Sequence, residues 1–125
     1  MRPDKFRVAK SLGVRSEHLA ARLLAERGYV IEARNVRFPV GEIDLVAREG
    51  QTLCFVEVRS ASSLQWGGPL ASIGNQKRRR LIRAATWSLQ RLRTLPASTR
   101  FDVVAITWQD GRASPELIQG AFTAD

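Results

Sequence analysis

The sequence predicts a single α/β domain, and three observations lead to this expectation. Two segments repeat apolar residues at helical spacing, and four segments alternate apolar and polar residues as strands do. The 125 residues, 44% of them hydrophobic, suffice for one domain with a core but are too few for two ordinary domains. The predicted order is helix, three strands, helix, strand and a short edge strand.

The first part of the chain is basic and then helical. Residues 1–14 show little hydrophobic periodicity, so we expect a loose basic arm. The arm could follow a phosphate backbone, although flexible charged termini are commonly without such a role. Residues 16–27 predict the first helix, with Ser16 able to cap its start and Gly28 able to follow its end. The apolar face of this helix comprises Leu19, Ala20, Leu23 and Leu24.

Three strands are expected next. Residues 29–35 alternate as the first strand, and residues 36–41 form a connection that Pro39 breaks. The stretch 41–60 reads GEIDLVAREGQTLCFVEVRS and predicts two strands joined by a turn at Gly50.

The turn sets the register of this hairpin. If Gly50 and Gln51 form a two-residue loop, Glu49 pairs with Thr52, and Asp44 then faces Glu57. A three-residue loop would instead mix apolar and polar faces. The same register sets Glu42 opposite Arg59 on the polar face, and on the core face it sets Ile43 against Val58 and Leu45 against Val56.

Two facing carboxylates, Asp44 and Glu57, require an explanation. Opposed side chains have Cβ atoms about 4.5–5.5 Å apart, and like charges at that distance are destabilising. Mg²⁺ or Mn²⁺ supplies one explanation, because Mg²⁺ takes oxygen ligands and is often held by one or two carboxylates. The other explanation is an ordinary solvated hairpin whose acids pair with Arg48 and Arg59. Spacing alone favours neither.

The second half of the chain contains a loop, a helix and the remaining strands. Residues 60–75 are rich in Ser and Gly and predict a long loop, which could bind substrate or could be an ordinary surface loop. Residues 76–95 predict the second helix, and 100–108 a strand that is buried on both faces. Residues 116–122 predict a short edge strand.

Positive charge is the strongest compositional signal. The formal net charge is +8, which favours binding to polyanions and leaves open nucleic acid, an anionic membrane surface or an acidic protein. A basic burst begins the second helix, where it opposes the helix dipole, so anion binding stands beside a merely solvated face. Trp66 could stack on a base or pack its loop onto the core. The candidate nucleic-acid-binding residues are Lys77, Arg78, Arg79, Arg80, Arg83 and Trp66.

Several other classes of protein are disfavoured. Cys54 is the single cysteine, which excludes an internal disulfide and disfavours a cysteine-based zinc site, and its position predicts a small core residue. The chain contains no apolar run that could span a membrane and no apolar stretch typical of a secretory signal. A cytoplasmic location and no membrane partner are therefore expected.

The central hairpin resembles the PD-(D/E)XK nuclease motif, with Asp44 as its aspartate and residues 57–59 as its E-X-K. Most of the chain resembles the YraN-like family of uncharacterised bacterial proteins. The residues that carry this second resemblance are Gly13, Glu17, Asn35, Arg37, Gly41 to Leu45, Phe55 to Arg59, Lys77 and Arg100 to Val104.

The resemblance implies a restriction-endonuclease-like core, in which helices flank a mixed sheet. It also implies metal-dependent hydrolysis of DNA, with branched or single-stranded DNA as candidate substrates. It implies Asp44, Glu57 and the Val58 carbonyl as metal ligands. Glu17 or Glu42 could reach the metal directly or through water, although on spacing alone the helix dipole explains Glu17. A homodimer would suit branched substrates.

One position departs from the family pattern. The family usually has Lys where this chain has Arg59, and the second basic residue that usually follows is replaced by serines and Ala61. Arginine stays protonated, so Arg59 can orient water or stabilise phosphate charge but cannot act as a base. We therefore expect weaker hydrolysis than in lysine-bearing relatives, or none. The alternatives are a non-catalytic nucleic-acid-binding or adaptor protein on the same fold and a module that docks a protein partner through the basic helix.

Overall fold

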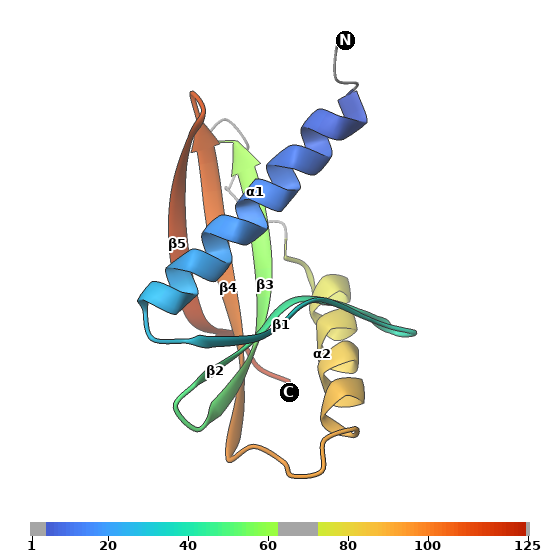
Figure 1. Ribbon diagram of the computed structural model, residues 1–125. Helices are drawn as coiled ribbons and strands as arrows, with labels where there is room; N and C mark the ends of the chain where they lie inside the picture. The colour runs from blue at the N-terminus through green and yellow to red at the C-terminus, as the bar shows by residue number, and fades with distance from the viewer. Residues whose placement is uncertain (1–4, 63–72, 125) are drawn as a thin grey trace.

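The computed structural model describes residues 5–62 and 73–124, which form two helices and one five-stranded sheet (Figure 1). Trp66 lies outside the described residues. The elements in chain order are α1 (Lys5–Glu26), β1 (Val30–Phe38), β2 (Gly41–Glu49), β3 (Thr52–Ser62), α2 (Asn75–Leu89), β4 (Ser98–Gln109) and β5 (Arg112–Phe122).

The strands lie in the sheet in sequence order, β1-β2-β3-β4-β5. Neighbouring strands are antiparallel except β3 and β4, which are parallel and are connected through α2. A parallel pair needs such a crossover, whereas antiparallel pairs need only short turns. The predicted α/β fold with a mixed sheet is confirmed, and the architecture is consistent with a restriction-endonuclease-like core.

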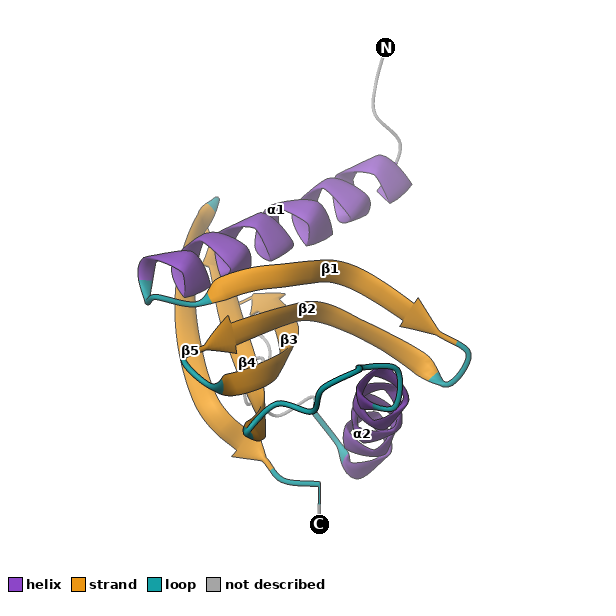
Figure 2. Cartoon of the chain, turned by 60° about the horizontal axis from the view of Figure 1, so that its bottom comes forward, coloured by secondary structure: helices purple, strands orange, loops and turns teal. Residues whose placement is uncertain are grey.

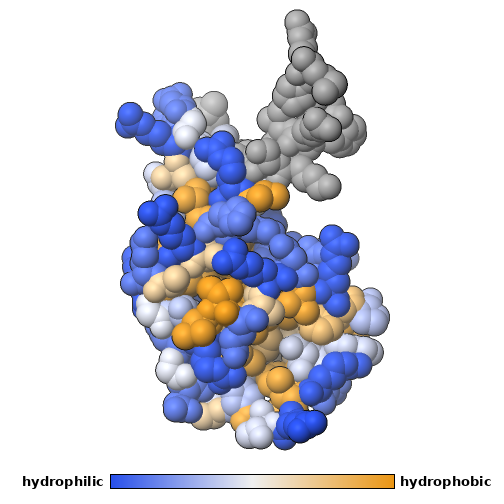
Figure 3. All heavy atoms as spheres, viewed as in Figure 1, coloured by the Kyte–Doolittle hydropathy of each residue, from blue (hydrophilic) through white to orange (hydrophobic). Residues whose placement is uncertain are grey.

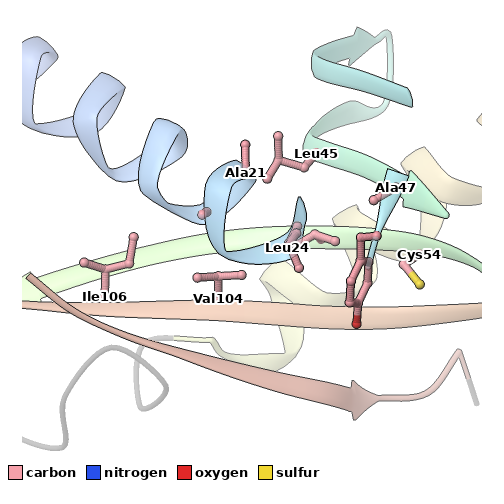
Figure 4. Packing of buried hydrophobic residues seen from close by; sticks show 10 residues of the cluster. Ala21, Leu24, Leu45, Ala47, Cys54, Val104 and Ile106 are labelled. Atoms are coloured by element: carbon pink, nitrogen blue, oxygen red, sulfur yellow. The ribbon is translucent and has the colours of Figure 1, made fainter. Parts of the chain in front are cut away.

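The helices cover opposite faces of the sheet (Figure 2). Successive residues of a strand point to opposite faces, so Cys54 and Val56 pack in the core beneath α1, and Leu53 and Phe55 pack in the core beneath α2. Figure 4 shows the first core, to which α1 contributes Ala21 and Leu24, β2 Leu45 and Ala47, and β4 Val104 and Ile106. The predicted burial of β4 on both faces is confirmed.

The hairpin therefore has no solvated face, which corrects the expectation of one core face and one polar face. Val46 is 8% exposed and Phe55 3% exposed, and both lie in the core beneath α2. Ile43 also packs in that second core, whereas Leu45 packs in the first. The sequence pattern marked this face as polar because of the charged residues that flank Val46 and Phe55. The helix that covers the face comes from a distant part of the chain.

Several element boundaries differ from the predictions. The helix α1 begins at Lys5, so residues 5–14 are helical and the expected loose arm is wrong for this segment. Helix-forming Lys, Arg, Ala and Leu residues are frequent there, although their apolar spacing is weak. β1 continues to Phe38, which reduces the predicted connection to a short turn, and β5 begins earlier than predicted, at Arg112.

The helix α2 ends at Leu89, which is earlier than the predicted end at residue 95. The guanidinium of Arg91 lies 3.9 Å from the centre of the Trp87 ring, and its Nη1 donates a hydrogen bond of 3.1 Å to the Trp87 carbonyl. A basic side chain thus satisfies a carbonyl of the last turn, as is common where helices end. Trp87 therefore contacts Arg91 through both its ring and its backbone carbonyl.

Hydrophilic residues cover most of the face shown in Figure 3, and several hydrophobic residues are exposed between them. Neither helix of the described chain combines the length and the apolar composition that a membrane-spanning helix needs.

Candidate functional site

The candidate site lies where strands β2 and β3 part. The predicted register is confirmed from Glu49, which pairs with Thr52, to Leu45, which pairs with Val56. One residue further, Asp44 Oδ2 accepts a hydrogen bond of 2.8 Å from the backbone N–H of Val58. The Asp44 side chain thus accepts a hydrogen bond that a backbone carbonyl would accept in a regular ladder. This hydrogen bond holds the Asp44 carboxylate against β3.

Asp44 and Glu57 form a partly buried carboxyl pair. Glu57 is 4% exposed and Asp44 is half-buried, and the two carboxyls are close enough to influence each other's charge. Burial, and then the charge of Glu57, raise the pKa of Asp44 to about 7, although the Val58 N–H and Lys77 act in the opposite direction. The pair therefore favours a proton or a cation near neutral pH.

Two basic side chains flank this pair. Lys77 Nζ lies 3.0 Å from Glu57 Oε1, and Arg59 Nη1 lies 3.7 Å from the same oxygen. Lys77 comes from the first turn of α2, and Arg59 follows Glu57 on β3. The expected Glu42–Arg59 pairing does not form, because the ladder between β2 and β3 ends at Leu45 and Val56; Glu42 instead forms an ion pair with Arg37 of β1, with 3.4 Å between its Oε2 and Arg37 Nε.

Glu17 bonds to β1, the strand that neighbours β2. Its Oε2 accepts a hydrogen bond of 2.9 Å from Asn35 Nδ2, which connects α1 to β1. Asn35 has a backbone φ of 50°, a conformation that asparagine tolerates better than most residues. Within residues 5–62 and 73–124, no three His, Cys, Asp or Glu side chains group as a metal site. The structure thus unites Asp44 and Glu57 but does not add Glu17 or Glu42 to them.

The donor set at the fork suits a hard divalent cation. Carboxylate and carbonyl oxygens are the ligands that Mg²⁺ prefers, and the ion usually keeps several waters or binds phosphate oxygens as well. The carboxyls of Asp44 and Glu57 are adjacent, and the raised pKa of Asp44 reflects their mutual repulsion as well as burial. A cation would relieve that repulsion, so the chemistry of these two side chains suits Mg²⁺ or Mn²⁺.

The remaining basic candidates lie along α2. Arg78, Arg79, Arg80 and Arg83 are all exposed. Arg78 and Arg79 line a pocket of about 500 Å³, where the guanidinium of Arg78 lies 5.6 Å from the centre of the Phe122 ring. Arg80 lines a second pocket of about 450 Å³, next to Lys77. The helix therefore presents three of these arginines, together with Lys77, to two separate pockets.

A second polar cluster was missed by the sequence reasoning. Asp102 is 1% exposed and accepts four hydrogen bonds, two from Arg100 and one each from the Tyr29 hydroxyl and the Gly120 N–H. Burial alone would raise the pKa of Asp102, but the hydrogen bonds from Arg100, Gly120 and Tyr29 hold it below its usual value. Arg100 Nη2 also donates to Glu49 Oε1 at 2.8 Å. All these acceptors are satisfied within the fold, so the cluster ties the strands together.

Comparisons with known proteins identify related sequences. The profile of the uncharacterised protein family UPF0102 matches residues 16–106. A UPF0102 protein of Anaeromyxobacter dehalogenans is 48% identical over 117 residues, which cover 93% of this chain and 87% of the relative. A UPF0102 protein of Moorella thermoacetica is 47% identical over 109 residues, which cover 85% of this chain and 90% of the relative. The chain therefore belongs to the uncharacterised protein family UPF0102, which is the YraN-like family that its motifs resemble.

Proposed function

We propose that this protein is a metal-dependent nuclease that hydrolyses phosphodiester bonds in DNA. One observation carries the proposal: the carboxyls of Asp44 and Glu57 lie beside each other at the fork of β2 and β3, and Lys77 and Arg59 pair with Glu57. Two carboxylates for a metal ion and positive charge for a phosphate are the groups that such hydrolysis requires.

Each residue has a distinct task in this proposal. Asp44, Glu57 and the Val58 carbonyl would hold the metal ion. When bound, Mg²⁺ or Mn²⁺ polarises a phosphate oxygen and lowers the pKa of an attacking water. The Val58 N–H keeps the Asp44 carboxylate in place through its 2.8 Å hydrogen bond. Lys77 and Arg59 supply positive charge where the transition state gathers negative charge.

The support for DNA as the substrate is electrostatic. The net charge of +8 and the exposed arginines of α2 suit contacts with phosphates, which provide affinity without reading the base sequence. Branched and single-stranded DNA are the first substrates to test. A homodimer, which would suit two-fold symmetric branches, forms part of the same proposal.

A cleavage assay tests the function. The protein is incubated with duplex, single-stranded and branched DNA in Mg²⁺ or Mn²⁺, and the Asp44→Asn and Glu57→Gln variants are assayed beside it. We expect each variant to lose about 100-fold or more in cleavage rate, and EDTA to abolish cleavage. Glu116→Gln is the matched control, because Glu116 is exposed on β5.

The rival function gives a different result. Lys77 and Arg59 already neutralise Glu57 without a metal, which is the observation that favours a non-catalytic nucleic-acid-binding protein. In that case, DNA binding would weaken with salt but survive EDTA and both carboxylate substitutions, with no cleavage. The absence of any salt-sensitive DNA affinity would instead point to a protein partner.

A further inference from the structure

A pocket adjoins the carboxyl pair, and the proposed function gives the pocket itself no role. It has a volume of about 450 Å³ and lies between the turn that joins β1 to β2 and the first half of α2. The pocket and the carboxyl pair share Lys77, which lines the pocket and also lies 3.0 Å from Glu57. A molecule in the pocket would therefore lie next to the proposed cleavage site.

Close packing of the turn against α2 forms this pocket. A Cβ at Gly41 would lie 3.3 Å from the Arg80 carbonyl oxygen and 3.7 Å from Ala84 Cβ, and Gly41 has a φ of +155°. Both the space and the backbone conformation thus favour glycine at this position. The close approach brings Val40 and Arg80 to the same pocket.

The pocket carries excess positive charge. Arg37, Lys77 and Arg80 line it, together with one acid, Glu42. Arg37 is paired with Glu42 at 3.4 Å, and Lys77 is paired with Glu57. Arg80 is exposed and forms no ion pair within the part of the chain that the structure describes. The pocket therefore offers at least one uncommitted guanidinium to an anionic group, and arginine suits phosphate geometry well.

The opposite wall is apolar. Phe38, Pro39 and Val40 line the pocket, and Val40 is 37% exposed, so its side chain is accessible to a ligand. An apolar wall facing an arginine suits a ligand with a flat apolar face and a phosphate. The volume lies within the range of pockets that hold small organic ligands.

We propose that this pocket binds one unpaired nucleotide of the strand being cleaved, with its base against Val40 and Pro39 and its phosphate at Arg80. The inference rests on the proposed nuclease function, because Lys77 joins the pocket to the carboxyl pair. A base that enters such a pocket must leave its stack and its pairing partner, which costs least in a strand that is already single. The substrate class is therefore DNA with an unpaired segment at the cleavage site, and not intact duplex.

Metal-free binding tests the pocket separately from catalysis. The amide signals of the ¹⁵N-labelled protein are followed by NMR in EDTA during titration with a short oligothymidylate, with thymidine monophosphate and with inorganic phosphate. We expect the oligothymidylate to saturate first and to shift the amides of Val40, Gly41 and Arg80. The variants Arg80→Ala and Val40→Asp should weaken its binding about ten-fold.

Two matched controls separate the pocket from general charge effects. Arg27→Ala removes the same charge from the exposed turn after α1, and Val30→Asp adds the same carboxylate at an aliphatic residue of β1 that is 64% exposed. Each control variant should change the affinity for the oligothymidylate less than about two-fold, because exposed charges away from the pocket contribute little. Equal weakening by the controls, or shifts confined to residues outside the pocket, would overturn the proposal.

The outcomes also distinguish this inference from the nuclease function. Saturation by thymidine monophosphate at the same concentration as the oligothymidylate would overturn the assignment to a DNA strand and identify a free nucleotide as the ligand. DNA cleavage that is unchanged in Arg80→Ala and Val40→Asp, and equally fast on duplex, would leave the nuclease standing without the pocket. Binding at the pocket without cleavage of any DNA would support the pocket and refute the nuclease.

Discussion

Lys77 Nζ lies 3.0 Å from Glu57 Oε1, closer than Arg59 Nη1, which lies 3.7 Å from the same oxygen. Arg59 occupies the position where the PD-(D/E)XK motif has its lysine, and it is two residues from Glu57 on the same strand. Lys77 reaches the carboxylate from α2 instead. The structure thus provides a lysine at the carboxyl pair although the motif position holds arginine.

The first prediction concerns these two cations. If Lys77 supplies the positive charge at the reacting phosphate, Lys77→Ala should lower kcat/KM for DNA cleavage about 100-fold, since one such contact contributes several kcal/mol to the transition state. Arg93→Ala is the control, because Arg93 is exposed beyond the end of α2.

Arg59→Lys distinguishes the two cations. From the sequence alone, restoring the usual lysine should raise cleavage, and we still expect a rise. With Lys77 already at Glu57, the rise should stay below about ten-fold, which is smaller than the loss in Lys77→Ala. A large gain in Arg59→Lys together with no loss in Lys77→Ala would assign the role to the strand position and not to the helix.

Metal binding is the second prediction. Calorimetric titration of Mg²⁺ or Mn²⁺ should show binding to the unaltered protein and none to the Asp44→Asn/Glu57→Gln variant, because that variant loses both carboxylate ligands. Asp110→Asn is the control, since Asp110 is exposed in the turn between β4 and β5. Equal binding heats for the Asp44→Asn/Glu57→Gln variant and for Asp110→Asn would contradict a metal site at the fork of β2 and β3.

The third prediction is a pH dependence of stability in EDTA. The pKa of Asp44 is about 7 in the fold, mainly through burial and then the charge of Glu57, against about 3.9 in an unfolded chain. The folded state therefore binds this proton more tightly, and the associated stabilisation is complete below about pH 4 and is lost as the pH rises through 7.

Urea unfolding at pH 5 and pH 8 measures this effect. We expect the free energy of unfolding to fall by about 2 kcal/mol between these values, after allowance for the partial exposure of Asp44. Asp44→Asn should remove most of the fall, and Asp110→Asn should leave it intact. A fall of the same size in Asp44→Asn would show that another group titrates.

The fourth prediction concerns the buried cluster around Asp102. Asp102→Asn should lower the free energy of unfolding by about 3 kcal/mol, because an amide cannot accept all the hydrogen bonds that Arg100, Tyr29 and the Gly120 N–H donate. Asp110→Asn should cost less than about 0.5 kcal/mol. Urea unfolding measures both. A loss of metal binding without a loss of stability would contradict a structural role for the cluster.

The fifth prediction tests the close approach at Gly41. Gly41→Ala should destabilise the protein by about 1–3 kcal/mol, since alanine disfavours a φ of +155° and its Cβ would crowd the Arg80 carbonyl. Gly74→Ala is the control, because a Cβ at Gly74 would have no atom within 4 Å and φ there is −83°, so this change should lose only the modest preference for glycine over alanine at the N-cap of α2. Thermal unfolding measures both, and equal shifts in Tm would refute the packing argument.

The hairpin is where prediction from the sequence succeeded best. The turn at Gly50 and the alternation of apolar residues on its two sides predicted the register from Glu49 to Leu45, and so identified Asp44 and Glu57 as neighbours. These signals are local, because a tight turn sets which residues face each other and a one-residue slip would reverse both faces. The start of α1 was missed, since residues 5–14 have helix propensity without clear periodicity.

The sequence by itself determined the order of the elements, the hairpin register and the carboxyl pair, because each depends on residues that are near one another in the chain. The tertiary structure decided that α2 covers the apparently polar face, that Lys77 reaches Glu57, that Glu17 bonds to Asn35, and that Tyr29 and Arg100 enclose Asp102. These contacts join residues far apart in the chain. Their geometry follows from how the helices pack on a twisted sheet, and the spacing of residues along the sequence carries no measure of it.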